Sequence, residues 1–386
     1  MTPARRMALQ YVLLFGANGV SLPFAGLWFR AQGFSGAEIG ALLAAPMLAR
    51  LVTGPVLAVW ADGFAHRRTP IAILGVAGAL AYAGAGVTQG VWVQGLLWFL
   101  GASTMAAMIP LTDVLNLSAA RRHGFAFAWP RGCGSAAFVA ANVLMGAILA
   151  RASVDWVIVW IVIAGVLVGV TAASLLPPEA VSDAGPGRKR DRYAGIARLV
   201  TDPGFMTAIV AIGAVQATHA FYYGFSAIAW KAQGISEATT GLLWATSVLV
   251  EIAFMWIVEP WRRARGIGPW PVLMLGGIAA VVRWTVLAFV PPLWALWPLQ
   301  ALHALTFAAT YLAGVEIIER LALPGQHTAA QTLSSVMAAG VLIGLATLAA
   351  GPLYDRYGTL GYLAMTGLAV MGLAAGWRLK RTLRIS

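Results

Sequence analysis

Apolar runs long enough to cross a lipid bilayer recur along the whole chain of 386 residues. Hydrophobic residues make up 60% of the sequence and charged residues 10%, a charge content too low for a typical water-soluble protein of this length. The bilayer interior offers no partner for free backbone N–H and C=O groups, so such runs must form helices or a closed barrel. Runs of about twenty residues indicate helices. The sequence therefore predicts an all-α membrane protein.

Charged residues and Gly/Pro punctuation divide the chain into twelve predicted membrane-spanning helices. The predicted spans are 8–30, 36–60, 69–88, 91–118, 124–150, 154–176, 204–230, 237–260, 270–290, 293–318, 328–353 and 359–379. One long hydrophilic segment separates the sixth span from the seventh. We therefore expect an N-terminal six-helix bundle over 1–177, a cytoplasmic linker over 178–203 and a C-terminal six-helix bundle over 204–386.

The basic residues predict the orientation of the chain in the membrane. A net charge of +12 would indicate nucleic-acid binding in a soluble protein, but here the Lys and Arg residues cluster in loops between spans. With the N-terminus inside, only Arg30, Arg151, Lys231 and Arg356 fall in outer loops. The positive-inside rule then places both termini in the cytoplasm and the chain in the inner membrane. We expect the lipid bilayer, and no nucleic acid, as a partner.

Two opposite charges lie at one depth in the fourth and fifth spans. Asp113 stands eight residues before the basic turn at 121–123, and Arg131 eight residues after it. At 1.5 Å per residue, both lie roughly 12 Å from that turn. Such charges inside apolar helices are costly unless they are paired or hydrated. They could form an ion pair that only clamps two helices, or they could face a hydrated cavity that holds a polar solute, which is our prediction.

The second half repeats this arrangement. Arg283 stands eight residues before the turn at 291–294, and His303 nine residues after it, so these two also share one depth. Glu251 and His219 lie near the middle of spans eight and seven. A single intramembrane histidine is more often structural, but several ionisable groups near the midplane favour a functional cavity. We predict one hydrated chamber shared by five of these residues: Asp113, Arg131, Glu251, Arg283 and His303.

Aromatic residues lie close in sequence to these polar positions. Any one of them has core packing as its commoner role, but as a group they suit an aromatic solute. They are Phe24, Trp28, Phe138, Tyr222, Tyr223, Trp284 and Phe307.

The first cytoplasmic loop of each half carries an acid followed by arginines. In the first half, Asp62 precedes Arg67 and Arg68, and we predict a gating loop in which the acid pairs with the arginines in one conformer. In the second half, we interpret Glu259, Arg262 and Arg263 as ordinary loop charge, and Glu316 and Glu319 as interfacial.

Several segments carry a resemblance to a known family. They are 110–113 (Pro-Leu-Thr-Asp), 131–138 with Arg131 and Phe138, 216–230 around His219, 281–284 with Arg283 and Trp284, and 302–303. The chain resembles the proton symporters of the major facilitator superfamily, and within it the branch of the lactose and phenylpropionate permeases. The resemblance implies twelve transmembrane helices in two six-helix bundles, with the solute bound between the repeats near mid-membrane.

The same resemblance implies roles for individual residues. Asp113 and Arg131 stand where lactose permease has the acid–arginine pair that grips its sugar, and Glu251 matches its acidic sugar ligand. Arg283 and His303 match an arginine and a histidine of that protein. Thr306, however, stands in place of its proton-releasing glutamate, so coupling must use another group or be absent. Phe138 replaces its sugar-stacking tryptophan, which weakens the case for a disaccharide.

The combined prediction is proton-coupled uptake of a small aromatic carboxylate by a monomer. The predicted substrate-binding residues are Asp113, Arg131, Phe138, His219, Tyr222, Tyr223, Arg283, Trp284 and Phe307. Either or both of the arginines would hold the carboxylate, and Glu251, His303 and Asp113 are the proton-coupling candidates. Sugar or nucleoside symport, drug efflux and a non-transporting sensor remain alternatives. No HExxH, DDxxD or GxSxG motif occurs, so we expect no enzyme, no cofactor and no metal.

Overall fold

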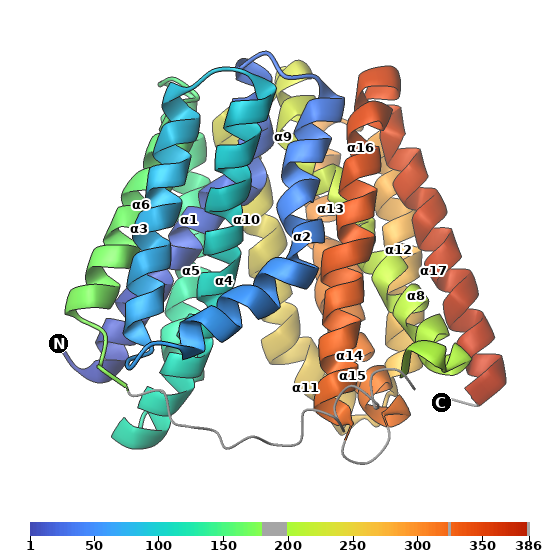
Figure 1. Ribbon diagram of the computed structural model, residues 1–386. Coiled ribbons are helices and arrows are strands. Elements are labelled where there is room, and N and C mark those ends of the chain that lie inside the picture. Colours follow the sequence, from blue (N-terminus) through green and yellow to red (C-terminus); the bar gives the residue numbers. More distant parts are fainter. Residues whose placement is uncertain (180–198, 323–325, 384–386) are drawn as a thin grey trace. The chain divides into compact units, whose positions relative to one another are not determined.

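The computed structural model describes residues 1–179, 199–322 and 326–383 and consists of long helices joined by short turns (Figure 1). In the first half, each predicted span coincides with one helix, and the ends differ by five residues or fewer. These helices are α1 (Pro3–Ala31), α2 (Gly36–Asp62), α3 (Arg68–Val87), α4 (Val91–His123), α5 (Ala128–Leu149) and α6 (Trp156–Ser174).

The second half also follows the predicted spans, but several of its helices are interrupted. The seventh span breaks at Thr218 into α8 and α9, and π-helical segments interrupt the eighth, tenth and eleventh. π-helical turns are rare and are frequent at functional sites. The elements are α8 (Pro203–Ala217), α9 (His219–Ala232), α10 (Glu237–Ala253), η1 (Phe254–Val258), α11 (Glu259–Ala264), α12 (Pro269–Ala288), α13 (Leu293–Ala301), η2 (Ala304–Ala309), α14 (Thr310–Leu321), α15 (His327–Ser335), η3 (Val336–Leu342), α16 (Ile343–Tyr357), η4 (Gly358–Gly361) and α17 (Tyr362–Leu383).

Local sequence explains where these helices begin and end. A capping box starts α2, because the Ser35 hydroxyl accepts from the Glu38 N–H while the Glu38 carboxylate accepts from the Ser35 N–H. Gly124 ends α4 in the left-handed region, with φ of 69°. Gly358 separates α16 from α17, with φ of 56°, where a side chain would be strained.

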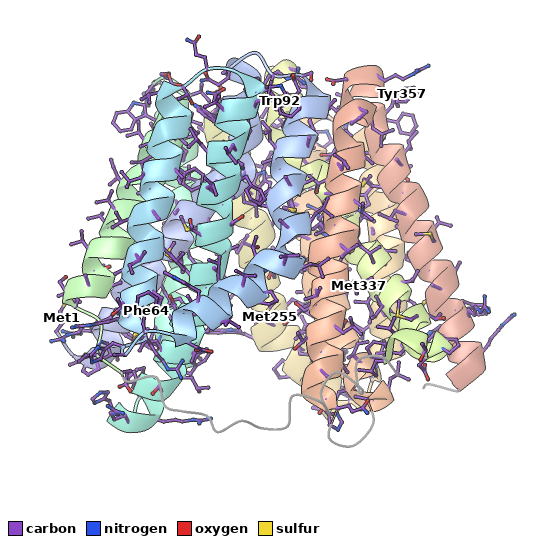
Figure 2. All side chains as sticks on the ribbon, in the orientation of Figure 1. Met1, Phe64, Trp92, Met255, Met337 and Tyr357 are labelled. Atoms are coloured by element: carbon purple, nitrogen blue, oxygen red, sulfur yellow. The ribbon has the colours of Figure 1, made fainter. Side chains whose placement is uncertain are left out.

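The described chain contains eleven helical stretches that are long and apolar enough to span a membrane. The last of them, 329–381, holds two successive crossings divided by η4, which agrees with twelve predicted spans. Large apolar side chains point outward, such as Val59 on α2, which is 75% exposed. Trp92, at the first turn of α4, is 90% exposed, in the position of an interfacial anchor (Figure 2). These features fit an all-α protein of the major facilitator fold whose solvent is lipid.

Packing divides the chain into two compact units. The first comprises Met1–Asp183 and Trp230–Ala245, and the second comprises Ala184–Ala229 and Thr246–Ser386. The segment 230–245 belongs to the first unit because Gly241 on α10 lies directly against the Asn142 carbonyl of α5. Most of the predicted linker, 178–203, lies outside the described residues, so the predicted domain limits remain a prediction.

Small residues allow the closest helix contacts in the first unit. A Cβ atom placed on Gly75 of α3 would lie 2.7 Å from the backbone nitrogen of Gly169 on α6. In the second unit, Phe205 and Ile209 of α8 belong to the same apolar core as Ile317 and Ile318 of α14. These cores fix the helices that carry the charged residues.

Candidate functional site

In the first unit, Asp113 of α4 and Arg131 of α5 form an ion pair through Oδ1 and Nη1. The Tyr11 hydroxyl of α1 donates to the same Oδ1 atom at 2.5 Å, and the Phe15 ring lies 5.5 Å from the Arg131 guanidinium carbon. The two charged side chains keep 30% and 39% of their surfaces exposed, so they are accessible rather than sealed in a dry helix contact. The two predicted side chains are thus in direct contact, and a hydrated cavity around them remains a prediction.

Tyr11 was not predicted as part of this pair. It reaches Asp113 because α1 approaches α5 closely at Gly134, where an added Cβ would lie 3.0 Å from the Tyr11 Cβ. Phe138, two turns after Arg131 on α5, is half-buried, and its carbonyl accepts from the Asn142 amide at 2.7 Å.

The second unit is organised around Arg283 of α12, which is fully buried. Its Nη1 donates to His303 Nδ1 at 3.1 Å and to Thr306 Oγ1 at 3.2 Å. Its Nη2 donates to Gln300 Oε1 at 3.0 Å. The guanidinium carbon also lies 4.5 Å from the centre of the Trp284 ring. All these partners are electrically neutral groups apart from the titratable His303, and no carboxylate of the described chain lies within ion-pair distance of Arg283.

His219 joins the same cluster from the break between α8 and α9. The Thr218 hydroxyl donates to the Val215 carbonyl at 2.6 Å and interrupts the helix just before His219. His219 Nδ1 lies 2.9 Å from the Gln216 carbonyl, and Nε2 lies 3.0 Å from Thr306 Oγ1. Aromatic rings surround the imidazole, with centroids within 6 Å: Tyr223, Trp284 and Phe307.

Gln300 of α13 also belongs to this cluster, although it was not among the predicted binding residues. Its Oε1 accepts from the Tyr222 hydroxyl at 2.9 Å and from the Ser247 hydroxyl at 2.7 Å, in addition to Arg283. The spacing of Gln300, His303 and Phe307 on one helix face was the signal that could have identified it.

Glu251 of α10 completes the cluster through His303. Its Oε2 lies 3.3 Å from His303 Nε2, and the Glu251 side chain is 16% exposed. The five ionisable residues predicted near mid-membrane therefore form two groups: Asp113 with Arg131 in the first unit, and Glu251, His303 and Arg283 in the second. That both groups face one chamber remains a prediction.

Within the described part of the second unit, several buried donors have no hydrogen-bond partner. They are Arg283 Nε, Trp284 Nε1 and Gln300 Nε2, and the Tyr362 hydroxyl oxygen is also unpaired. The Tyr362 ring stacks on Trp284 with a centroid distance of 5.7 Å and an interplanar angle of 2°. Unpaired buried polar atoms are rare in proteins, and at a binding site they indicate where a polar ligand can dock.

The end of the second unit where α11 meets α14 holds a charge network, which corrects one expectation. Glu259 accepts from Arg262 at 2.8 Å through each carboxylate oxygen and from Arg263 at 2.6 Å. Arg262, with a 5% exposed side chain, also pairs with Glu316 at 2.9 Å. Buried, bidentate pairing is not ordinary loop charge. Glu316 holds both Arg262 and Arg320, and its interfacial position remains a prediction. The contact between Arg262 and Glu316 could not be foreseen because α11 and α14 are far apart in sequence.

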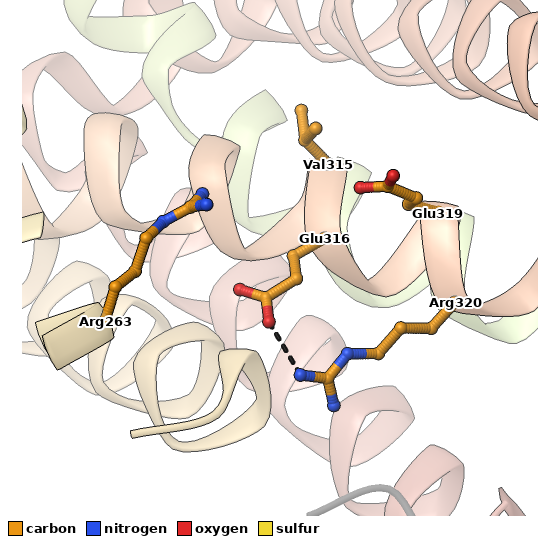
Figure 3. Close-up of a pocket in the computed structure, with 5 residues that line it drawn as sticks. All are labelled: Arg263, Val315, Glu316, Glu319 and Arg320. Carbon is orange, nitrogen blue, oxygen red and sulfur yellow. Dashed lines mark hydrogen bonds and ion pairs between the residues drawn. The ribbon is translucent and has the colours of Figure 1, made fainter. Parts of the chain in front are cut away.

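A hollow of about 460 Å³ opens beside this network. Its lining consists of Arg263, Val315, Glu316, Glu319 and Arg320, and the pair between Glu316 and Arg320 spans 2.6 Å (Figure 3).

The corresponding loop of the first unit is arranged differently. Asp62 is exposed and forms no ion pair with Arg67 or Arg68 in the described chain. Arg68 instead donates to the Leu176 carbonyl at 3.1 Å. The acid that pairs with an arginine at this end of the first unit is the buried Glu179, whose carboxylate lies 3.1 Å from Arg122. Glu179 was not predicted because it follows two prolines at the start of the hydrophilic segment. The acid–arginine contact expected at Asp62 is absent from this conformer, and the gating role of the loop remains a prediction.

A larger hollow of about 730 Å³ lies among α1, α5 and α6 of the first unit. Its lining is apolar and includes the free Cys133, Trp156 and Trp160. The Trp160 indole already donates to the Gly16 carbonyl at 3.1 Å. Among the described residues, no group of three or more His, Cys, Asp or Glu side chains could hold a metal ion.

Comparison with known proteins assigns the family. A model of the MFS_1 like family matches residues 4–363. The chain belongs to this family. It is 27% identical over 379 residues to the "Probable 3-phenylpropionic acid transporter" of Escherichia coli (strain K12), covering 96% of both chains. It is 24% identical over 360 residues to the "Maltose permease" of Geobacillus stearothermophilus, covering 90% of this chain and 87% of that one.

Solved structures show the same fold. The nucleoside transporter NupG superposes with a TM-score of 0.85 at 16% identity, covering 98% of this chain and 99% of that chain. A bacterial homologue of the human lysosomal transporter Spinster superposes with a TM-score of 0.75 at 15% identity, covering 99% of this chain and 97% of that chain. The resemblance to major facilitator transporters is thus confirmed, and the chain is a multi-pass membrane transporter of this superfamily.

Proposed function

We propose that this chain takes up a small aromatic carboxylate together with a proton, by alternating access across the inner membrane with both termini in the cytoplasm. The observation that carries the proposal is the state of Arg283, a fully buried cation whose described partners include no carboxylate. A buried charge without a counter-charge costs several kcal/mol inside a membrane protein. An anionic substrate would place a carboxylate in direct contact with Arg283, a contact that no described residue supplies.

The unpaired donors around Arg283 support a carboxylate in particular. An ionised carboxylate only accepts hydrogen bonds and offers about four lone-pair positions on its two oxygens. Arg283 Nε, Trp284 Nε1 and Gln300 Nε2 are donors that still need an acceptor. Arg131 already has a carboxylate partner in Asp113, so this difference favours Arg283 as the residue that binds the substrate anion.

The aromatic residues of the second unit suit the rest of such a substrate. Tyr222, Trp284 and Phe307 lie within the cluster, and Tyr362 stacks on Trp284. Aromatic rings gain about 0.5–1.5 kcal/mol per pair beyond the burial of their area. The name of the E. coli relative, a 3-phenylpropionic acid transporter, agrees with this chemistry. Proton coupling would use Glu251 and His303, with Asp113 as the remaining candidate, since Thr306 cannot carry a proton.

A neutral sugar or nucleoside is the second candidate. The accessible Asp113–Arg131 pair, with the Tyr11 hydroxyl beside it, could bind substrate hydroxyl groups. The maltose permease among the sequence relatives is consistent with this alternative.

Binding measurements on the purified protein separate the two candidates. We expect 3-phenylpropionate to bind at least tenfold more tightly than the neutral amide of the same skeleton, and Arg283→Gln to abolish that preference. Arg151→Gln, at an exposed arginine of an outer turn, is the matched control and should keep it. Equal binding of the acid and the amide, or binding of maltose or uridine without competition from 3-phenylpropionate, would contradict the proposal. In proteoliposomes, uptake of labelled 3-phenylpropionate should depend on an imposed pH gradient.

A further inference from the structure

The hydrogen bonds of His303 determine where its proton lies. A guanidinium group carries only donors, so His303 Nδ1, 3.1 Å from Arg283 Nη1, must accept with a lone pair. The imidazole is therefore neutral and carries its hydrogen on Nε2, which faces Glu251 Oε2 at 3.3 Å. Arg283 thus occupies the one nitrogen of His303 that could take another proton.

The hydrogen bonds of His219 also determine which of its ring nitrogens carries the hydrogen, and the result is the opposite tautomer from that of His303. The Gln216 carbonyl can only accept, so His219 Nδ1 carries the hydrogen. His219 Nε2 then accepts from the Thr306 hydroxyl, whose oxygen accepts from Arg283. Neither nitrogen of His219 contacts Arg283 directly, so His303 is the histidine whose proton-accepting atom depends on that arginine.

With the imidazole neutral and Glu251 ionised, the charges that face His303 sum to zero, although no carboxylate touches Arg283 directly. Arg283 approaches from α12 and Glu251 from α10, and the α9 side chains His219 and Tyr222 lie with ring centroids 5.2 and 6.4 Å away. Phe307 stacks at 5.3 Å and carries no charge. An anion bound alone would leave the cluster with one buried negative charge, and a proton alone with one positive charge. Binding both restores neutrality and avoids a cost of several kcal/mol for an unpaired buried ion.

We propose that a substrate carboxylate bound to Arg283 releases His303 Nδ1, and that this nitrogen then takes the cotransported proton. The inference rests on the proposed function, because it requires an anionic substrate. The Arg283 Nη1–H hydrogen bond moves from His303 Nδ1 to a substrate oxygen, and the freed lone pair forms an N–H bond with a proton delivered by water. The imidazolium keeps donating from Nε2 to the Glu251 carboxylate. Departure of the substrate returns Nη1 to His303 and expels the proton, which sets one proton per carboxylate.

Proton uptake on binding tests this step. Purified protein in a weakly buffered solution with a pH indicator dye is saturated with 3-phenylpropionate, and the protons taken up are divided by the ligand bound. We expect a ratio of about one for the wild type, as charge neutrality of the buried cluster requires. The ratio should fall to zero in His303→Asn, whose Oδ1 can still accept from Arg283 but cannot carry a proton. His327→Asn, at an exposed histidine of α15, is the control and should keep the wild-type ratio. A ratio that persists in His303→Asn and vanishes in Glu251→Gln would assign the proton to Glu251 and overturn the inference.

A second measurement does not depend on the substrate. The chain has five histidines, so ¹⁵N-histidine labelling gives a small set of imidazole signals, and His303→Asn identifies those of His303. We expect an unprotonated Nδ1 and a protonated Nε2 in the ligand-free protein. A protonated Nδ1 would overturn the inference whatever the substrate is. Failure of the wild type to bind 3-phenylpropionate would contradict the proposed function instead. The tautomer of His303 would then still show whether Arg283 donates a hydrogen bond to His303 Nδ1.

Discussion

The Glu259–Arg262–Glu316 network offers a quantitative test of the structure. Arg262 has a 5% exposed side chain and is held by two carboxylates, Glu259 at 2.8 Å and Glu316 at 2.9 Å. Removing the only partner of a buried ion costs about 3–5 kcal/mol. Because either acid can still hold Arg262 when the other is neutralised, each single substitution should cost less than this, about 1–2 kcal/mol, in the range of a hydrogen bond to a charged group.

The double substitution should therefore cost more than the sum of the single ones. Glu259→Gln with Glu316→Gln leaves Arg262 buried without a carboxylate, and the double-mutant cycle should show a coupling of about 1–2 kcal/mol. The assay is the unfolding of the purified protein in detergent, followed by tryptophan fluorescence. Glu319→Gln is the matched control, since Glu319 on the same helix is exposed, and it should change stability by less than about 0.5 kcal/mol. Additive single effects, or single effects equal to that of Glu319→Gln, would refute a buried network.

Two further predictions concern the first unit. Tyr11→Phe removes the hydroxyl that donates to Asp113 at 2.5 Å. Because Asp113 is partly exposed, we expect a loss of only about 1 kcal/mol in unfolding free energy. An unchanged unfolding free energy would contradict the hydrogen bond between Tyr11 and Asp113. Gly75→Ala puts a Cβ 2.7 Å from the Gly169 backbone nitrogen, so it should lower thermal stability by a cost of about 1–3 kcal/mol from overpacking. Gly86→Ala, where the nearest atom lies 3.4 Å away, is its control, and equal melting temperatures for the two variants would argue against the close contact of α3 with α6.

The sequence predicted the membrane spans well because hydropathy and charge act locally along the chain. The equal depths of Asp113 with Arg131, and of Arg283 with His303, also followed from sequence, since helical rise counted from a shared turn needs no tertiary information. Both pairs are in direct contact in the structure.

What the sequence could not predict depends on contacts between distant helices. Tyr11 is one tyrosine in an apolar helix, and only the close approach of α1 to Gly134 brings it to Asp113. The second carboxylate that holds Arg262 belongs to Glu316, which lies 54 residues further along the chain. The π-helical segment η2 directly follows His303 and contains Thr306. The chamber expected to hold all five charged residues would be lined by both units, and it remains a prediction.

The most direct test of the account is the substitution Gln300→Glu, followed by measurement of substrate affinity and thermal stability. Gln300 Oε1 lies 3.0 Å from Arg283 Nη2, so a glutamate of the same shape would give this buried arginine a permanent counter-charge. We expect 3-phenylpropionate to bind about 100-fold more weakly, corresponding to about 3 kcal/mol, while the melting temperature stays the same or rises. If Gln300→Glu leaves the affinity for 3-phenylpropionate unchanged, the claim that Arg283 binds the carboxylate of the substrate is contradicted.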